Sequence, residues 1–198
     1  MIVVGIKTWE QEEYLYDAVL SAINIADEII IAFGSRDTQS THDPKETTAL
    51  IAKLIAENPG KIAVIRGNWK TGAEAMNAMW QLASEGDYFI RLEGNEIIPE
   101  GFVDELNDRL LDIVESNLPL YAKTLYFWKD VKHTIHTPVL DKLQFRGRMV
   151  NHRLKIMIPE DFPNPSMKNI KMKSNILSYK YITNKYVGKN YTIEPYSE

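Results

Sequence analysis

The sequence contains no cysteine, which excludes disulfide bonds and metal sites built from thiolates. It also lacks a P-loop and a Gly-x-Gly-x-x-Gly turn. Four histidines are present, at 42, 133, 136 and 152, and only those at 133 and 136 are close in sequence. A zinc site is therefore not expected, because no further paired ligand accompanies them.

Long apolar runs are missing as well. None approaches the length needed to cross a bilayer, so no transmembrane segment is expected. Residues 1–5 carry neither the basic region nor the cleavage site of a signal peptide. A cytoplasmic location is the resulting expectation.

What the chain does contain is the composition of an ordinary globular protein, with 198 residues, 44% of them hydrophobic and 25% charged. This length is enough to bury a core and favours one domain. The net charge is -4, yet the region after Lys123 is rich in Lys, Arg, Tyr and His. No nucleic-acid-binding motif accompanies these basic residues, so nucleic acid is not expected as a partner. Formation of a homo-oligomer stays open.

Apolar runs and helical repeats alternate along the first part of the chain, an order that predicts parallel strands joined by right-handed crossovers. The second helix has a strong start, because Asp43 suits the N-cap, Pro44 the first helical position and Glu46 the third. The expected strands are residues 2–6, 28–33, 61–65 and 87–92, and the expected helices are residues 11–25, 44–57, 73–83 and 99–115. The buried stripe predicted for the second helix is Leu50, Ile51, Leu54 and Ile55.

Beyond Pro119 the pattern changes, with little sign of helix. The strands expected there are residues 120–128, 143–146, 154–158 and 176–182. The predicted fold class is α/β, a Rossmann-type three-layer sandwich with a mostly parallel central sheet and a smaller mixed or β-rich C-terminal part. We expect a single domain over residues 1–198, with halves at 1–117 and 118–198.

The fourth predicted strand ends in Glu93-Gly94-Asn95-Glu96, two carboxylates and an amide. Open α/β sheets bind ligands at the carboxyl ends of their strands, and the first and fourth strands adjoin in a doubly wound order. Residues 93–96 would then lie beside Thr8, Glu10 and residues 34–37. Their oxygens could hold a hard divalent cation against a phosphate. The alternative is that Glu93 and Glu96 are solvated charges ahead of the next helix.

Short motifs follow one another in a fixed order. They are Glu-Gln-Glu-Glu-Tyr-Leu at 10–15, Gly-Ser-Arg-Asp at 34–37, Gly72 ahead of a helix with Asn77, and Gly-Asp-Tyr at 86–88 leading to Glu-Gly-Asn at 93–95. Over residues 2–114 this series resembles the nucleotide-sugar-binding half of GT-A glycosyltransferases, family 2 in particular. The chain departs from the family where Ala32-Phe33 replaces an acidic pair, and where Glu93-Gly94-Asn95 replaces Asp-x-Asp.

The resemblance implies a GT-A-like fold and transfer of a sugar from a nucleotide-diphosphate donor to a hydroxyl acceptor such as a saccharide. It further implies an inverting single displacement with Mn²⁺ or Mg²⁺. The residues that it implies are Thr8, Glu10, Phe33, Ser35, Asp37, Gly72 and Glu93 for the donor, Glu93, Asn95 and Glu96 for the metal, Trp128 and Lys129 for the acceptor side, and Asp161 as catalytic base.

Other interpretations stay open for these residues and for the whole chain. Phe33 and Trp128 also suit a core, and Asp37 and Asp161 also suit turns. A binding module that has kept the fold and lost the chemistry agrees with the two departures. A nucleotidyltransferase would need a basic phosphate loop near the first strand, which Lys7 alone does not supply.

Overall fold

A computed structural model of the chain describes residues 1–9, 12–34, 44–84, 87–116, 120–122, 124–128, 130–136, 144–148, 170–171, 173, 176–181 and 192–195. In this part of the chain, no helix is both long enough and apolar enough to span a membrane. The first elements are β1 (Ile2–Thr8), α1 (Glu12–Ile23), β2 (Glu28–Phe33), α2 (Pro44–Glu57), β3 (Ile62–Arg66), α3 (Gly72–Trp80), β4 (Tyr88–Glu93), β5 (Glu96–Ile97) and α4 (Glu100–Ser116). The later ones are β6 (Leu120–Ala122), β7 (Thr124–Trp128), β8 (Asp130–His136), β9 (Gln144–Arg148), β10 (Ile170–Lys171), β11 (Ile176–Tyr181) and β12 (Thr192–Pro195).

The main sheet of the described residues has the strand order β10-β6-β9-β4-β1-β2-β3. Strands β1, β2, β3 and β4 all run in the same direction, and β1 lies between β2 and β4. Strand β9 is antiparallel to both β4 and β6. The mostly parallel α/β sheet predicted from the sequence is therefore confirmed.

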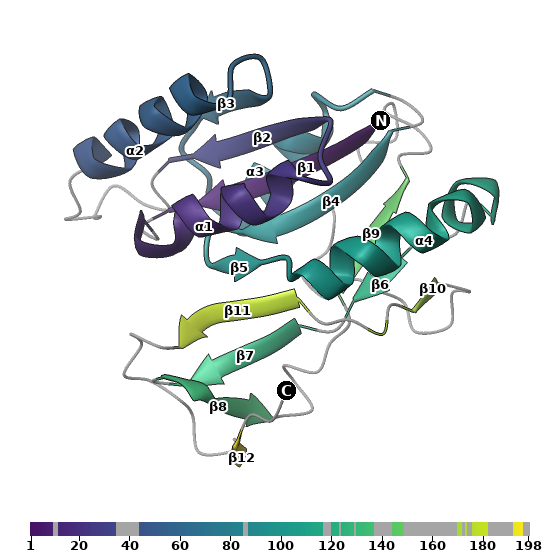
Figure 1. The fold of residues 1–198 in the computed structure, drawn as a ribbon. Coiled ribbons are helices and arrows are strands. Elements are labelled where there is room, and N and C mark those ends of the chain that lie inside the picture. The colour runs from purple at the N-terminus through teal and green to yellow at the C-terminus, as the bar shows by residue number, and fades with distance from the viewer. Residues whose placement is uncertain are drawn as a thin grey trace.

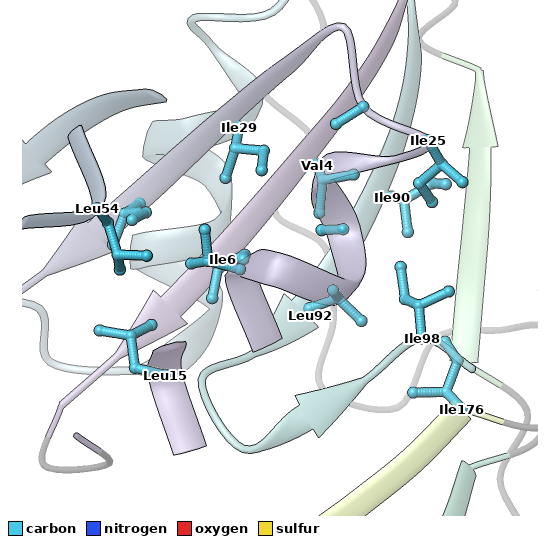
Figure 2. Packing of buried hydrophobic residues seen from close by; sticks show 14 of the residues in the cluster. Val4, Ile6, Leu15, Ile25, Ile29, Leu54, Ile90, Leu92, Ile98 and Ile176 are labelled. Carbon is cyan, nitrogen blue, oxygen red and sulfur yellow. The ribbon is translucent and has the colours of Figure 1, made fainter. Parts of the chain in front are cut away.

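Helices cover both faces of this sheet, which makes three layers (Figure 1). Alternate residues of β1 explain why both faces are apolar, since successive side chains of a strand point to opposite faces. Val4 and Ile6 pack with α1, α2 and α4, whereas Val3 packs with α3 on the other side. Figure 2 shows the larger of the two cores, in which Val4, Ile6, Leu15 and Leu54 come together from β1, α1 and α2.

A second sheet, of order β12-β8-β7-β11-β5, contains most of the described C-terminal strands. Its link to the first part is β5, which follows β4 and pairs antiparallel with β11. Ile98 and Ile176 carry this contact into the larger core, where both are buried (Figure 2). The β-rich C-terminal part predicted from the sequence is confirmed for the described residues.

The structure corrects several predicted boundaries. β1 continues to Thr8, two residues beyond the predicted strand 2–6, because Lys7 and Thr8 still pair with β2. The run expected as one strand over 120–128 forms the two strands β6 and β7 in different sheets. Ile55 was predicted in the buried stripe of α2 but is 39% exposed. The strand expected at 154–158 lies outside the described residues.

Candidate functional site

The carboxyl ends of β1 and β4 lie side by side in the middle of the main sheet. The chain crosses from β1 to β2 on one side, whereas β4 pairs with β1 on the other side, so the strand order reverses between β1 and β4. Such a switch point is where open α/β sheets leave a crevice for ligands. The predicted adjacency of the first and fourth strands is thus present.

An ion pair joins the ends of these two strands. Lys7 and Glu93 are register partners in the parallel pairing, and the Lys7 Nζ lies 3.1 Å from Glu93 Oε1. Both side chains are largely shielded, with exposed fractions of 18% and 27%. Such a pair is less screened than one on the open surface.

The Lys7 side chain points to the α3 face of the sheet, and Gly72 leaves room for its ammonium there. A Cβ added to Gly72, the first residue of α3, would overlap the Lys7 Nζ. Thr71 caps this helix by accepting a hydrogen bond from the Glu74 N–H at 3.2 Å. The ammonium therefore lies next to the positive end of the α3 dipole.

A tight turn follows β4 and holds the predicted metal-binding residues. The Gly94 N–H donates to the Lys7 carbonyl oxygen at 2.9 Å, and the Glu93 N–H donates to Glu96 Oε2 at 3.0 Å. Glu96 begins β5 and is 1% exposed. Its carboxylate closes the turn, which differs from the solvated charge considered from the sequence.

Asn95 lies inside this turn and is 3% exposed. Its Oδ1 is buried and accepts no hydrogen bond from the part of the chain that the structure describes. Buried acceptors are seldom left unpaired in folded proteins, so this atom has capacity for one donor or cation.

The described carboxylates do not by themselves fit a divalent-cation site. Glu93 is paired with an ammonium, Glu96 is engaged by a backbone N–H, and Asn95 contributes no charge. Mg²⁺ and related ions are normally held by free carboxylate oxygens. Among the described residues no three His, Cys, Asp or Glu side chains are grouped to hold a metal ion. The Mn²⁺ or Mg²⁺ expected from the sequence stays a prediction.

Two predicted donor residues lie on the opposite face of the sheet from Lys7. Phe33 is buried in the larger core, with the Arg66 guanidinium 5.1 Å from its ring centre. A hollow of about 210 Å³ adjoins that ring, lined by Phe33, Thr48, Ile51, Ala52, Ile55, Val64 and Arg66. Thr8 faces the same side by strand alternation and is 1% exposed. The structure thus joins Gly72 and Glu93 through Lys7 and leaves Phe33 apart from them.

Other predicted residues cannot be placed. Glu10, Ser35, Asp37, Lys129 and Asp161 lie outside the described residues. Trp128 is the last residue of β7 in the second sheet, and only its backbone is described.

Lys7 is the residue of this site that sequence reasoning undervalued. It was considered only as a lone base, too little for a phosphate loop. The signal that finds it is strand periodicity, since Val3 and Lys7 are four residues apart and share one face of β1. Its partner Glu93 follows only once the register of β4 is known.

Replacing Thr8 with valine is expected to raise the free energy of unfolding by about 1 kcal/mol, since a buried hydroxyl without a partner destabilises the folded state. The Thr8 Oγ1 has no hydrogen-bond partner among the described residues. Thr47 is an equally buried threonine that does have a partner, so Thr47→Val should lower stability instead. Urea unfolding of both variants measures the difference, and destabilisation by Thr8→Val would show that its hydroxyl is satisfied.

Burial raises the pKa of the Tyr88 hydroxyl well above its ordinary value. Tyr88 begins β4, at the opposite end of that strand from Glu93. This hydroxyl therefore stays protonated and takes no part in the proton balance of the site.

Comparison with known proteins gives the following. No family model matches the chain. It is 29% identical over 112 residues to the carbamoyl phosphate synthase large chain of Clavibacter michiganensis subsp. michiganensis (strain NCPPB 382), a match that covers 52% of this chain and 10% of that protein. The chain thus spans about a tenth of the length of that curated relative, too little to assign its family.

Among solved structures, the chain is similar to the crystal structure of S. aureus TarS 1-349, with a TM-score of 0.43 and 15% identity over 63% of this chain and 36% of that one. A likeness at this TM-score carries no argument about function. The α/β, Rossmann-like class of the fold follows from the strand order and the two helical layers described above.

Proposed function

We propose that this chain is a glycosyltransferase that moves a sugar from a nucleotide-diphosphate donor to a hydroxyl acceptor such as a saccharide. The observation that carries the proposal is the group formed by Lys7, Gly72 and Glu93 at the switch point between β1 and β4. That is the place where the motif series of the sequence predicts the donor diphosphate. The family 2 character and the inverting outcome rest on the sequence resemblance.

In the proposed reaction the acceptor oxygen forms a new bond to the anomeric carbon while the bond from that carbon to the diphosphate oxygen breaks. The electron pair leaves with the diphosphate, and the acceptor proton passes to a base, for which Asp161 is the predicted residue. The role of the Lys7 ammonium is to stabilise the charge that builds up on the leaving diphosphate.

A second candidate is a nucleotide- or glycan-binding module without transfer activity. The observation that favours it is the Lys7–Glu93 ion pair, which occupies the first carboxylate of the predicted metal motif. Binding of a nucleoside diphosphate is common to the transferase and to a nucleotide-binding module, so transfer must be measured separately.

The direct test is thermal unfolding in the presence of UDP, GDP, CDP, ADP and dTDP, each with Mn²⁺ and with EDTA. A ligand that binds only the folded state at about 100 times its Kd adds about 2.7 kcal/mol of stability. For a chain of this size that is a rise in Tm of roughly 5–10 °C. The matched nucleosides without phosphate serve as controls and should give little shift.

Absence of a shift with every diphosphate at millimolar concentration, in folded protein, would contradict the transferase and a nucleotide-binding module, and would favour a glycan-binding module. A shift accompanied by release of the diphosphate from the matching nucleotide sugar supports the transferase. A shift without such release, in the presence of varied saccharide acceptors, favours the binding module.

A further inference from the structure

A positively charged side chain, Lys7, lies at the candidate site where the sequence predicts a metal ion. A leaving diphosphate needs a positive group beside it, and either a divalent cation or a Lys or Arg side chain can provide that charge. In this chain the Lys7 ammonium lies within the predicted metal motif, 3.1 Å from Glu93 Oε1.

The position of this ammonium is fixed from two sides. Lys7 is in β1 and its register partner Glu93 is in β4, so the pairing of two central strands places the two side chains next to each other. On the second side, Gly72 makes room for the Nζ, and any larger residue there would overlap it. A site with this much support holds its charge in place before a ligand arrives.

A divalent cation and this ammonium compete for one place. A metal ion on Glu93 would sit about 2.0–2.6 Å from a carboxylate oxygen, and the Lys7 Nζ already lies 3.1 Å from Oε1. The two positive charges would repel each other at that range. The other oxygen ligands of the turn do not offset this repulsion, because the Glu96 carboxylate accepts a hydrogen bond from the Glu93 N–H and Asn95 is neutral.

We propose that the Lys7 ammonium takes the place of the divalent cation and neutralises charge on the diphosphate of the donor. Its ion pair with Glu93 and the space left by Gly72 keep it in this position. Nucleoside diphosphate binding is then independent of Mn²⁺ and Mg²⁺. A lysine has three N–H donors, so the ammonium can keep its contact with Glu93 while donating to a phosphate oxygen. This inference rests on the proposed function, since it names the group that binds the donor.

The first part of the test is calorimetric titration of the chain with the five diphosphates named above, in EDTA and in Mn²⁺. The wild type should bind the preferred diphosphate with the same Kd in both. Lys7→Met keeps the length of the side chain and removes its charge, and should weaken binding about 10- to 100-fold, the contribution of one charge-assisted hydrogen bond. Lys7→Arg should retain most of the affinity.

The second part separates the position of the charge from the fold. Gly72→Ala adds a methyl group where the Lys7 Nζ lies, and alanine favours a helix more than glycine does. This variant should therefore unfold no more easily than the wild type while binding the diphosphate several-fold more weakly. Lys53→Met removes an exposed lysine on α2 and serves as the charge control, with unchanged affinity expected.

Each outcome has a defined meaning. Wild-type binding that requires Mn²⁺, or a Lys7→Met variant that binds as well as the wild type, overturns the role of Lys7 and leaves the proposed function intact. Absence of diphosphate binding by the wild type in both EDTA and Mn²⁺ overturns the proposed function, and this inference with it.

Discussion

Replacing Gly34 with alanine is expected to lower the free energy of unfolding by about 3 kcal/mol, the upper end of the usual cost of overfilling a packed site. The added Cβ would overlap the carbonyl oxygen of Gly67 and lie 2.9 Å from its carbonyl carbon. Gly67 has little freedom to retreat, because its N–H donates to the Phe33 carbonyl oxygen at 3.3 Å and β3 pairs with β2 just before it. Urea unfolding measures the loss as a lower midpoint at unchanged m.

Gly5→Ala provides the matched comparison, because there the new Cβ would overlap a side chain, the ring of Phe89. We expect Gly5→Ala to lower the free energy of unfolding by about 2 kcal/mol, and by less than about 1 kcal/mol when Phe89 is also replaced with leucine. A double-mutant cycle measures this difference. Trp69→Leu should not relieve Gly34→Ala in the same way, although Trp69 Nε1 lies 3.3 Å from the added Cβ. If Trp69→Leu restored stability to Gly34→Ala as much as Phe89→Leu does to Gly5→Ala, the cost of Gly34→Ala would not come from the overlap with the Gly67 backbone.

Gly34→Ala also links the stability of the fold to the candidate site. The backbone after Gly67 leads through Thr71, the N-cap, into Gly72 at the start of α3. Displacement of Gly67 would move this segment, including Gly72 beside the Lys7 ammonium. Gly34→Ala should therefore weaken nucleoside diphosphate binding even below the temperature at which it unfolds the protein.

The first half of the fold could be predicted because its signals are local. The predicted second strand has the observed bounds of β2, since its isoleucines are buried on both faces. The end of α2 was marked by Asn58-Pro59-Gly60, and Gly60 adopts a φ of 76°, which favours glycine. Where neighbouring residues decide the conformation, sequence reasoning was sufficient.

Elements that depend on distant pairing were missed. β5 has two residues, too few for any periodicity, and exists because Glu96 and Ile97 pair with β11 far along the chain. β8 carries mostly polar residues and was not among the predicted strands, yet it pairs with both β7 and β12. Such strands are set by their neighbours in space, which a single sequence does not contain.

The candidate site divides in the same way. The position of Glu93 at the end of a central strand followed from the apolar run before it, as predicted. The contact with Lys7 did not, because it requires the relative register of β1 and β4, two strands separated by three helices. Phe33 was open to two interpretations from the sequence, and the structure places its side chain in the core.

Replacing Asp161 with asparagine is expected to lower the rate of sugar transfer by about 10²- to 10⁴-fold, the usual contribution of a general base. Asp161 lies outside the described residues, so this prediction rests on the sequence, where Glu160-Asp161 lies between Pro159 and Pro163. The amide keeps the shape of the carboxylate but cannot accept the proton of the acceptor hydroxyl. Donor binding does not need that proton transfer, so the Tm shift with the nucleoside diphosphate should be unchanged.

Glu160→Gln is the matched control, because it removes the neighbouring carboxylate by the same chemical change. If Asp161 is the base, this control should keep its rate within a few-fold of the wild type, since only one of the two carboxylates accepts the proton. A large loss in Glu160→Gln with little loss in Asp161→Asn would transfer the role to Glu160. Loss of both transfer and nucleotide binding in Asp161→Asn would instead mean that Asp161 supports the donor site, because a base acts only after the donor is bound.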